Sequence, residues 1–222
     1  LMVDYEVPEL PTVCSLSYQL QCNYACKFCR TEPYKTCECE RNKYLKIEKE
    51  VKKMLPHLKT LMSNGAGEFF CSDSIIKLIE KLNKDINICI ETNGSLFNEK
   101  NWQRIKKLGE HNLSVAVTVH SFNEDTYRYL SGTMLPVAQV IHNLEFISEL
   151  RKKNIVNRFE IATVVCERNF REMPEYVKKC LNDFTMDTIR LRFFEPYGVM
   201  DVNTEWFYDV RNEYHPYHDE FE

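Results

Sequence analysis

Three cysteines stand close together near the start of the chain. Cys22, Cys26 and Cys29 are spaced four and then three residues apart in the segment CNYACKFC. Thiolates are preferred ligands of iron-sulfur clusters, and a four-iron cube held by three thiolates keeps one iron open to an outside ligand. An open iron favours catalysis over simple electron transfer. We therefore interpret this segment as a cluster-binding loop with a catalytic role.

A zinc site is the alternative use of the same thiols, because short cysteine pairs also build tetrahedral zinc centres. Cys37 or Cys39 would then complete the ligand set. Zinc sites usually come as two separated pairs of cysteines, whereas this loop offers one triplet, so the cluster is preferred. A zinc-binding interaction module and a simple electron-transfer protein remain as alternative functions. Cys37 and Cys39 are assigned no special role.

The overall composition is that of an ordinary globular protein. The 222 residues are 44% hydrophobic and carry a formal net charge of -4, which disfavours general nucleic-acid binding. No apolar run approaches the roughly 20 residues that a membrane-spanning helix needs, and the N-terminal residues lack a signal-peptide pattern. Ten cysteines without a signal peptide indicate a reducing compartment, so we expect a cytoplasmic protein.

Short β-rich runs alternate with amphipathic stretches along the chain. Strands are predicted at Val13 to Leu20, Thr60 to Ser63, Ile86 to Glu91, Leu113 to His120, Arg158 to Cys166 and Thr188 to Phe194. Parallel strands need long crossover connections, and only the right-handed crossover packs well. The alternation therefore predicts an α/β fold, a partial, open (β/α)6 TIM-like barrel with parallel strands.

Helices are predicted between these strands. Their ranges are Leu45 to Leu61, bent or divided at Pro56; Ile75 to Leu82, capped by Asp73 or Ser74; a helix beginning at Asn98; a helix from Asn123 through Leu130; Val137 to Lys153; and Pro174 to Leu181. In such folds the loops after the strands converge at the carboxyl ends of the sheet, where function gathers. Most of the unusual residues of this chain fall in those loops.

The cysteine loop resembles the signature of the radical S-adenosylmethionine (SAM) superfamily, a Cys-x-x-x-Cys-x-x-Cys loop with an aromatic residue in the place of Phe28. The resemblance spans nearly the whole chain. It implies a [4Fe-4S] cluster on the three cysteines, with SAM chelating the fourth iron. It also implies that an electron from the cluster breaks the sulfonium bond, releasing a 5′-deoxyadenosyl radical that abstracts a substrate hydrogen. A reductant such as flavodoxin or ferredoxin would be a partner.

Two further segments resemble motifs of this family. Gly65-Ala66-Gly67-Glu68 is similar to its Gly-Gly-Glu motif, with Ala66 in place of the first glycine, and implies that Ala66, Gly67 and Glu68 hold the SAM amino group. Glu91-Thr92-Asn93-Gly94 is similar to a Thr-Asn-Gly segment of the family. Thr92 and Asn93 can donate hydrogen bonds to a carboxylate, and a plain Asn-Gly turn is the alternative.

The later strands contribute weaker similarities. Thr118 and His120 stand where the family has Ser and Asp of a Ser-x-Asp-Gly ending, near the SAM ribose and methionine portions. His120 departs from that pattern; it is either a proton donor or acceptor for the substrate, since histidine titrates near neutrality, or a hydrogen-bonded strand-end residue. Asn169 ends a similar segment after strand five. Phe193 or Phe194 would pack on adenine, while core packing is expected for at least one of them.

A narrower resemblance points to the SPASM-associated radical SAM proteins. It rests on Leu16-Ser17-Tyr18, Cys29-Arg30 and the segment Val210 to Pro216, although no cysteine follows Gly198 to form an auxiliary cluster. We expect a core domain over 1–198 and a C-terminal capping or docking segment over 199–222. The substrate is unknown, and modification of a peptide or a carbohydrate is the favoured reaction.

Overall fold

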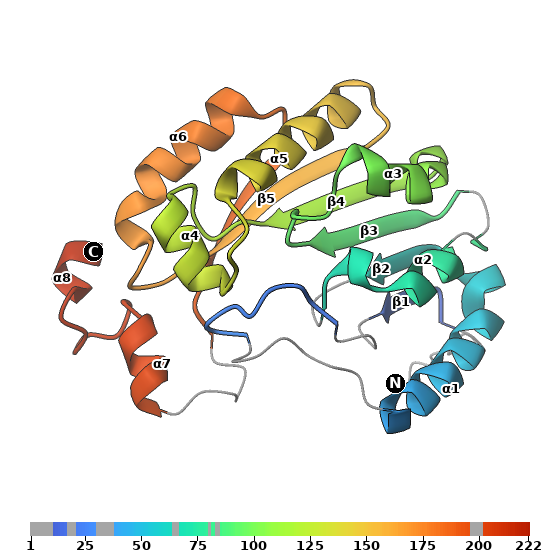
Figure 1. The fold of residues 1–222 in the computed structure, drawn as a ribbon, viewed down its shortest axis with the longest axis horizontal. Helices are drawn as coiled ribbons and strands as arrows, with labels where there is room; N and C mark the ends of the chain where they lie inside the picture. The colour runs from blue at the N-terminus through green and yellow to red at the C-terminus, as the bar shows by residue number, and fades with distance from the viewer. Residues whose placement is uncertain are drawn as a thin grey trace, which may run out of the picture.

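One parallel sheet forms the centre of the molecule (Figure 1). The computed structural model describes residues 11–16, 21–29, 38–63, 67–79, 81–82, 85–195 and 202–222, with the backbone alone at 38–44 and 202. The strand order is β1-β2-β3-β4-β5-β6, and all neighbours are parallel. The strands are β1 (Val13–Leu16), β2 (Thr60–Ser63), β3 (Asn87–Thr92), β4 (Asn112–Thr118), β5 (Arg158–Val165) and β6 (Thr188–Phe193). The predicted open, parallel α/β fold is confirmed.

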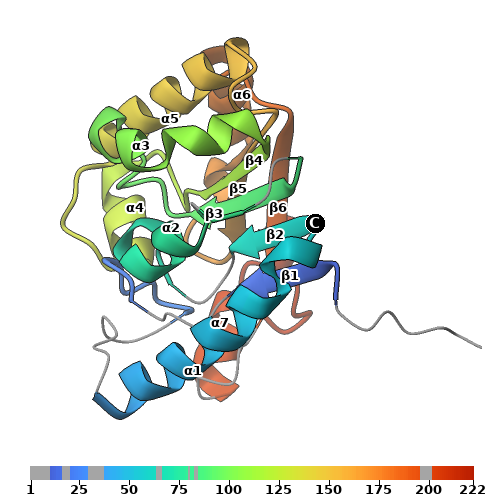
Figure 2. The same cartoon turned by 90° about the vertical axis from the view of Figure 1, so that its right-hand side faces the viewer.

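Helices cover one face of this sheet. Figures 1 and 2 show α2 to α6 on the same side of the strands. The α-helices are α1 (Glu38–Met54), α2 (Asp73–Ile79), α3 (Glu99–Ile105), α4 (Glu124–Ser131), α5 (Val137–Lys152), α6 (Met173–Asp183), α7 (Val202–Tyr208) and α8 (His218–Phe221). Short 3-10 helices are η1 (Leu55–His57), η2 (Phe69–Cys71), η3 (Lys106–Glu110) and η4 (Phe170–Glu172). The opposite face of the sheet, here called the concave face, is not covered by α2 to α6.

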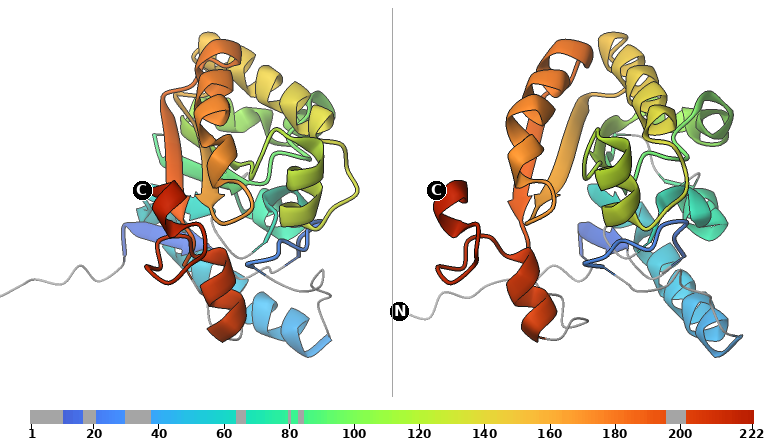
Figure 3. Two further views of the ribbon diagram at one scale, coloured as in Figure 1. Left: turned by 90° about the vertical axis from the view of Figure 1, so that its left-hand side faces the viewer. Right: turned by 60° about the vertical axis from the view of Figure 1, so that its left-hand side comes forward.

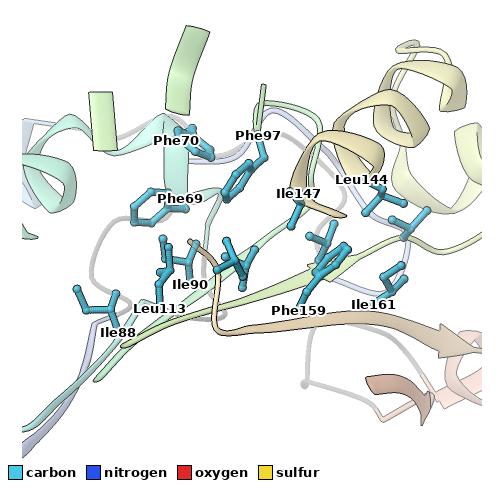
Figure 4. Close-up of a cluster of buried hydrophobic side chains, with 14 of the residues drawn as sticks. Phe69, Phe70, Ile88, Ile90, Phe97, Leu113, Leu144, Ile147, Phe159 and Ile161 are labelled. Carbon is cyan, nitrogen blue, oxygen red and sulfur yellow. The ribbon is translucent and has the colours of Figure 1, made fainter. Parts of the chain in front are cut away.

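The hydrophobic core lies between the sheet and those helices. Leu113, Val115 and Val117 of β4 are fully buried, whereas the residues that alternate with them are partly accessible. Side chains along a strand point to opposite faces in turn, so the apolar set of each strand meets the helices. Figure 4 shows the result, with Phe159 of the sheet near Leu144 and Ile147 of α5, and Ile88 beside Leu113 further along the sheet. Each fully buried aliphatic side chain contributes roughly 1.5–3 kcal/mol.

The first helix differs from its prediction at both ends. It begins at Glu38 rather than Leu45 and ends at Met54, and the residues after it form η1, which contains Pro56. The early start was missed because the first turns carry few apolar residues to mark a helical period. The early end follows from Pro56, which has no backbone N–H to continue the α-helical ladder. Of the first predicted strand, residues 17–20 lie outside the described residues.

Helix α2 has a different cap from the one predicted. The hydroxyl of Ser72 accepts a hydrogen bond from the backbone N–H of Ile75 at 3.2 Å, so the capping side chain precedes both Asp73 and Ser74. The predicted helix starts at Asn98 and Asn123 are confirmed. Asn98 accepts a bond from the Asn101 N–H, and Asn123 accepts bonds from the N–H groups of Asp125 and Thr126. Side-chain oxygens at these positions satisfy donors that the first helical turn leaves unpaired.

The C-terminal helices lie beside the end of β6, away from α2 and α3 (Figures 1 and 3). Backbone contacts fix this placement. The Glu167 N–H donates to the Tyr208 carbonyl at 3.1 Å, and the Arg211 guanidinium donates to the Phe194 carbonyl at 2.7 Å. Arg171 forms an ion pair with Glu220. The segment therefore packs on the loops at the carboxyl ends of β5 and β6.

The described residues include no helix that is both long enough and apolar enough to cross a bilayer.

Candidate functional site

The three cysteines of the loop at 21–29 line one cavity of about 500 Å³. Thr92 and Thr118, the last residues of β3 and β4, line the same cavity, so it opens at the carboxyl ends of the strands. Other predicted site residues in its wall are Gly67, Glu68, Asn93 and His120. Ala66 and Cys37 lie outside the described residues, and the side chain of Cys39 is not described. The fold thus gathers segments that are far apart in the sequence.

The cysteine loop is fastened to the end of helix α4. The Ala25 N–H donates to the Ser131 carbonyl at 3.1 Å, and the Lys27 N–H donates to the Leu130 carbonyl at 2.9 Å. The next residue, Gly132, has a left-handed φ of 58° and ends the helix. A Cβ atom on Gly132 would lie 2.1 Å from the Ala25 carbonyl oxygen. Glycine therefore allows both the helix end and the close approach of the loop. This role has no signature in the sequence, because the contact joins residues that are far apart along the chain.

Two aromatic residues of the loop anchor it further. The hydroxyls of Tyr24 and Tyr127 hydrogen-bond to each other, and burial raises the pKa of both phenols. The ring of Phe28 is buried and meets the His120 ring edge-on, with 4.8 Å between their centroids. These contacts join the loop to α4 and to the end of β4. The aromatic position before the last cysteine therefore packs the loop against the cavity wall.

Glu68 is a carboxylate buried at the cavity wall, with 2% of its surface exposed. Its two oxygens accept hydrogen bonds from the Thr92 hydroxyl at 2.6 Å and the Asn93 N–H at 2.7 Å. Burial raises the pKa of Glu68, and these hydrogen bonds act in the opposite direction. A buried anion is favoured by a cation beside it, so this corner of the cavity suits an ammonium group.

The raised pKa of Glu68 predicts a pH effect on folding. A carboxyl whose pKa is higher in the folded chain favours folding while it is protonated, and this contribution is lost as pH rises through the raised pKa. For the chain without SAM, we expect the free energy of unfolding to fall as pH rises from the ordinary pKa of a glutamate to the raised pKa of Glu68. The fall should be smaller in Glu68→Gln. Urea unfolding at a series of pH values checks this. Equal pH dependence in the two proteins would contradict it.

The segment Thr92-Asn93-Gly94 connects Glu68 to the cysteine loop. The Asn93 amide donates to the side-chain oxygen of Asn23 at 2.9 Å and lies 3.8 Å from the Cys22 sulfur. Gly94 has a φ of 75°, so the turn that was the alternative interpretation is also present. The carboxylate that Thr92 contacts is the protein's own, that of Glu68. The segment therefore orders two parts of the cavity at once.

His120 projects into the cavity from the end of β4. It is 5% exposed, and its Nδ1 atom has no hydrogen-bond partner among the described residues. Burial, with a smaller contribution from the charge of Arg192, lowers the pKa of His120 to about 4. This pKa lies below the range in which an unperturbed histidine titrates, so the imidazole is neutral at neutral pH.

Asn169 does not line the cavity. Its side chain is fully buried; the amide group donates to the carbonyls of His120 and Val164, and the side-chain oxygen accepts from the Cys166 N–H. These three bonds leave the side chain committed to the backbone that carries His120. Asn169 stands at a position that resembles a cofactor-binding one, but in this structure its side chain supports the backbone behind the cavity wall.

Phe193 and Phe194 both line the cavity but differ in burial. Phe194 is buried against Phe28 and Tyr208, whereas Phe193 is about half exposed and contacts Phe221. Phe194 therefore has the core packing that was expected for at least one of the two residues. Phe193 keeps an accessible ring surface.

A family model described as the radical SAM superfamily matches residues 16–180. This match covers most of the chain, and the protein belongs to the radical SAM superfamily. Membership implies a [4Fe-4S] cluster and SAM as cofactors, and a reductant and a substrate as partners. Among curated proteins no match is found.

Several solved structures share the fold. SuiB from Streptococcus suis aligns with a TM-score of 0.61 and 16% identity, over 86% of this chain and 42% of that one. The enzyme anSMEcpe, solved with AdoMet and a peptide, aligns with a TM-score of 0.54 and 20% identity, over 87% and 56%. Methylornithine synthase (PylB) aligns with a TM-score of 0.54 and 16% identity, over 83% and 53%. The chain thus spans about half the length of these proteins.

The cavity wall fits the two implied cofactors. Three thiols and one buried carboxylate face the same space, and these are donors for iron and for an ammonium group. Within the described ranges, no three His, Cys, Asp or Glu side chains are grouped to hold a single metal ion. The ligands of a four-iron cube bind different irons, so they need not converge on one point as the ligands of one zinc ion do. The eight cysteines whose side chains are described form no disulfide.

Proposed function

We propose that this chain is the core of an enzyme that cleaves SAM reductively and abstracts hydrogen from a substrate. Cys22, Cys26 and Cys29 would hold the [4Fe-4S] cluster. A bound cluster would supply one electron to break a carbon-sulfur bond of SAM, which would give methionine and a 5′-deoxyadenosyl radical. That radical would take a hydrogen atom from the substrate and leave as 5′-deoxyadenosine. The observation that carries the proposal is the shared cavity of the three thiols and Glu68.

Glu68 would bind the SAM amino group. Its buried carboxylate attracts the ammonium, and Thr92 and Asn93 hold the carboxylate in place through the bonds described above. Gly67 and Ala66 belong to the same assignment, since small residues let a ligand approach the backbone. Thr118 would contribute a hydroxyl from the end of β4. The exclusion of water by Phe28 and Phe194, both buried at the wall, strengthens these polar contacts.

The domain and partner assignments belong to the same proposal. Residues 1–198 would form the catalytic core and 199–222 a capping segment, which the contacts of Tyr208 and Arg211 support. Flavodoxin or ferredoxin would be the reductant, in a cytoplasm that keeps thiols reduced. A peptide is the favoured substrate over a carbohydrate, because anSMEcpe was solved with a peptide bound. The narrower relation to SPASM-associated proteins is also proposed.

Anaerobic reconstitution tests this function. The chain is supplied with iron and sulfide, reduced with dithionite and assayed for 5′-deoxyadenosine from added SAM. We expect product from the parent and none from the triple variant Cys22→Ala, Cys26→Ala, Cys29→Ala, because the cluster then has no ligands. Cys89→Ala, on the concave face but outside the cavity wall, should retain cluster and product.

A different result would support the alternative function. A parent chain that binds zinc stoichiometrically, assembles no cluster and never cleaves SAM would replace the enzyme with a zinc-binding interaction module. Loss of product in Cys89→Ala equal to that of the triple variant would contradict the assignment of the three ligands.

A further inference from the structure

A row of side chains crosses the concave face of the sheet at its carboxyl end. Val164 of β5 pairs with Arg192 of β6. On the other side of β5, Thr118 of β4 pairs with Ala162, and two residues further along His120 lies opposite Val164. Paired residues of parallel strands point to the same face. His120 and Arg192 therefore flank Val164, and all three line the cavity.

Both polar members of this row have unused hydrogen-bonding nitrogens. The Nδ1 atom of His120 and the Nε atom of Arg192 are buried and have no hydrogen-bond partner within the described part of the chain. Buried polar atoms in folded proteins are nearly always paired, so two such atoms in one cavity wall indicate a missing group. The Nε–H of arginine can only donate, and a neutral imidazole can donate from Nδ1. The group that satisfies both is an acceptor.

Charge makes this acceptor an anion. Within the described residues, Arg192 is the one Lys or Arg of the cavity wall, and no acidic side chain forms an ion pair with it. The neighbouring Arg190 and Arg158 are both paired with Glu160. The carboxylates of Glu68, Glu91 and Glu195 also line the cavity. Among the residues that the structure describes, Arg192 is thus a guanidinium without a partner, and its planar fork suits a carboxylate.

The position of Arg192 separates this anion from the carboxylate of SAM. In the proposed function the SAM amino group lies at Glu68, beside the end of β3, and its carboxylate is bonded to the same carbon. Arg192 lies on β6, three strand spacings from β3, or roughly 14 Å along the sheet. If SAM extends from Glu68 toward β6, the part that reaches β6 is its adenosine, which carries no negative charge.

We propose that Arg192 and His120 form a binding site for a carboxylate of the substrate. This inference rests on the proposed function, because it assigns the Glu68 side of the cavity to SAM. It adds a chemical class: the substrate carries an anionic carboxylate close to the atom that loses hydrogen, as an acidic side chain or a chain terminus of a peptide would. Val164 between the two donors supplies an apolar surface for the adjacent carbon atoms.

Succinate serves as the probe, with uncharged succinamide as its control. Calorimetric titration is carried out on the reconstituted chain loaded with SAM. We expect succinate to bind and succinamide not to bind. A hydrogen bond between charged groups contributes enough that Arg192→Gln should weaken succinate binding about 10- to 100-fold. Arg192→Lys, which keeps the charge but loses the fork, should lose less.

Arg158→Gln is the matched control. It makes the same change on the same face of the sheet, outside the cavity wall, and should bind succinate as the parent does. The affinity for SAM should be unchanged in Arg192→Gln. Competition between succinate and SAM, or a loss of SAM affinity in Arg192→Gln, would show that the anion is the carboxylate of SAM and overturn the proposal.

Absence of succinate binding, or equal binding by the parent and Arg192→Gln, would also overturn it. These outcomes are distinguishable from failure of the proposed function. If the parent cleaves SAM but does not bind succinate, only the carboxylate site is rejected. If the parent assembles no cluster, the proposed function is rejected together with the carboxylate site.

Discussion

Gly132→Ala is expected to lose most of its iron-sulfur cluster. The new Cβ would lie 2.1 Å from the Ala25 carbonyl oxygen. The Cβ is fixed to the Gly132 backbone and the oxygen belongs to the Ala25 backbone, so neither can yield without moving the loop or the helix end. The left-handed φ of 58° adds about 1–2 kcal/mol of strain for alanine. We expect the iron bound per chain after reconstitution, and the yield of 5′-deoxyadenosine, to fall about 10-fold or more, a shift of about 1.4 kcal/mol.

Two further variants separate the collision from other effects of the substitution. Gly109→Ala meets the Ile155 side chain at 2.7 Å, far from the loop, and should cost stability while keeping the cluster. Gly132→Asn has the same Cβ, but asparagine tolerates a left-handed backbone, so it should lose iron as Gly132→Ala does. Iron content and circular dichroism are measured on all three. A Gly132→Ala protein with full iron content would contradict the role of this glycine.

Glu68→Gln is expected to weaken SAM binding roughly 10- to 100-fold while the cluster still assembles. The variant keeps the size of the side chain but removes the charge that attracts the SAM ammonium, an interaction of about 1.5–3 kcal/mol. It also turns an amide N–H toward a donor, because the Thr92 hydroxyl and the Asn93 N–H each donate to one carboxylate oxygen. Equilibrium dialysis of SAM against the reconstituted chain gives the affinity.

Glu91→Gln is the control for Glu68→Gln. It makes the same change in the same cavity wall, one residue before Thr92, without the hydrogen bonds that hold Glu68. SAM affinity should change little in Glu91→Gln. If the two variants lose affinity equally, the effect belongs to the total charge of the cavity and not to Glu68.

Most of the fold could be predicted from local sequence patterns. The alternation of Leu113, Val115 and Val117 marks β4 without any tertiary information, and Asn98 and Asn123 mark helix starts through their side-chain caps. The order of the strands then follows from the rule that consecutive strands usually lie side by side and are joined by right-handed crossovers. The start of α1 lacked such a pattern, so its boundary could not be predicted.

The candidate site was predictable only where it is local in sequence. The cysteine triplet and Glu68 stand in short motifs, and both line the cavity. Gly132 and Arg192 have no local signature, because their roles depend on the Ala25 carbonyl and on which arginines Glu160 already occupies. Asn169 stood in a motif, yet its bonds to three backbone groups turn it away from the cavity.

The fastening of the cysteine loop has an electronic consequence for the proposed cluster. Hydrogen bonds donated to the sulfurs of a cluster raise its reduction potential. The N–H groups of Ala25, Lys27 and Cys29 donate instead to the carbonyls of Ser131, Leu130 and Cys26. The Cys22 sulfur accepts a hydrogen bond from the Tyr24 N–H at 3.4 Å and one from the Asn93 amide at 3.8 Å, so at least this ligand of the proposed cluster is hydrogen-bonded. These two bonds would raise the reduction potential of a cluster held by the loop, and so make the cluster easier for its reductant partner to reduce.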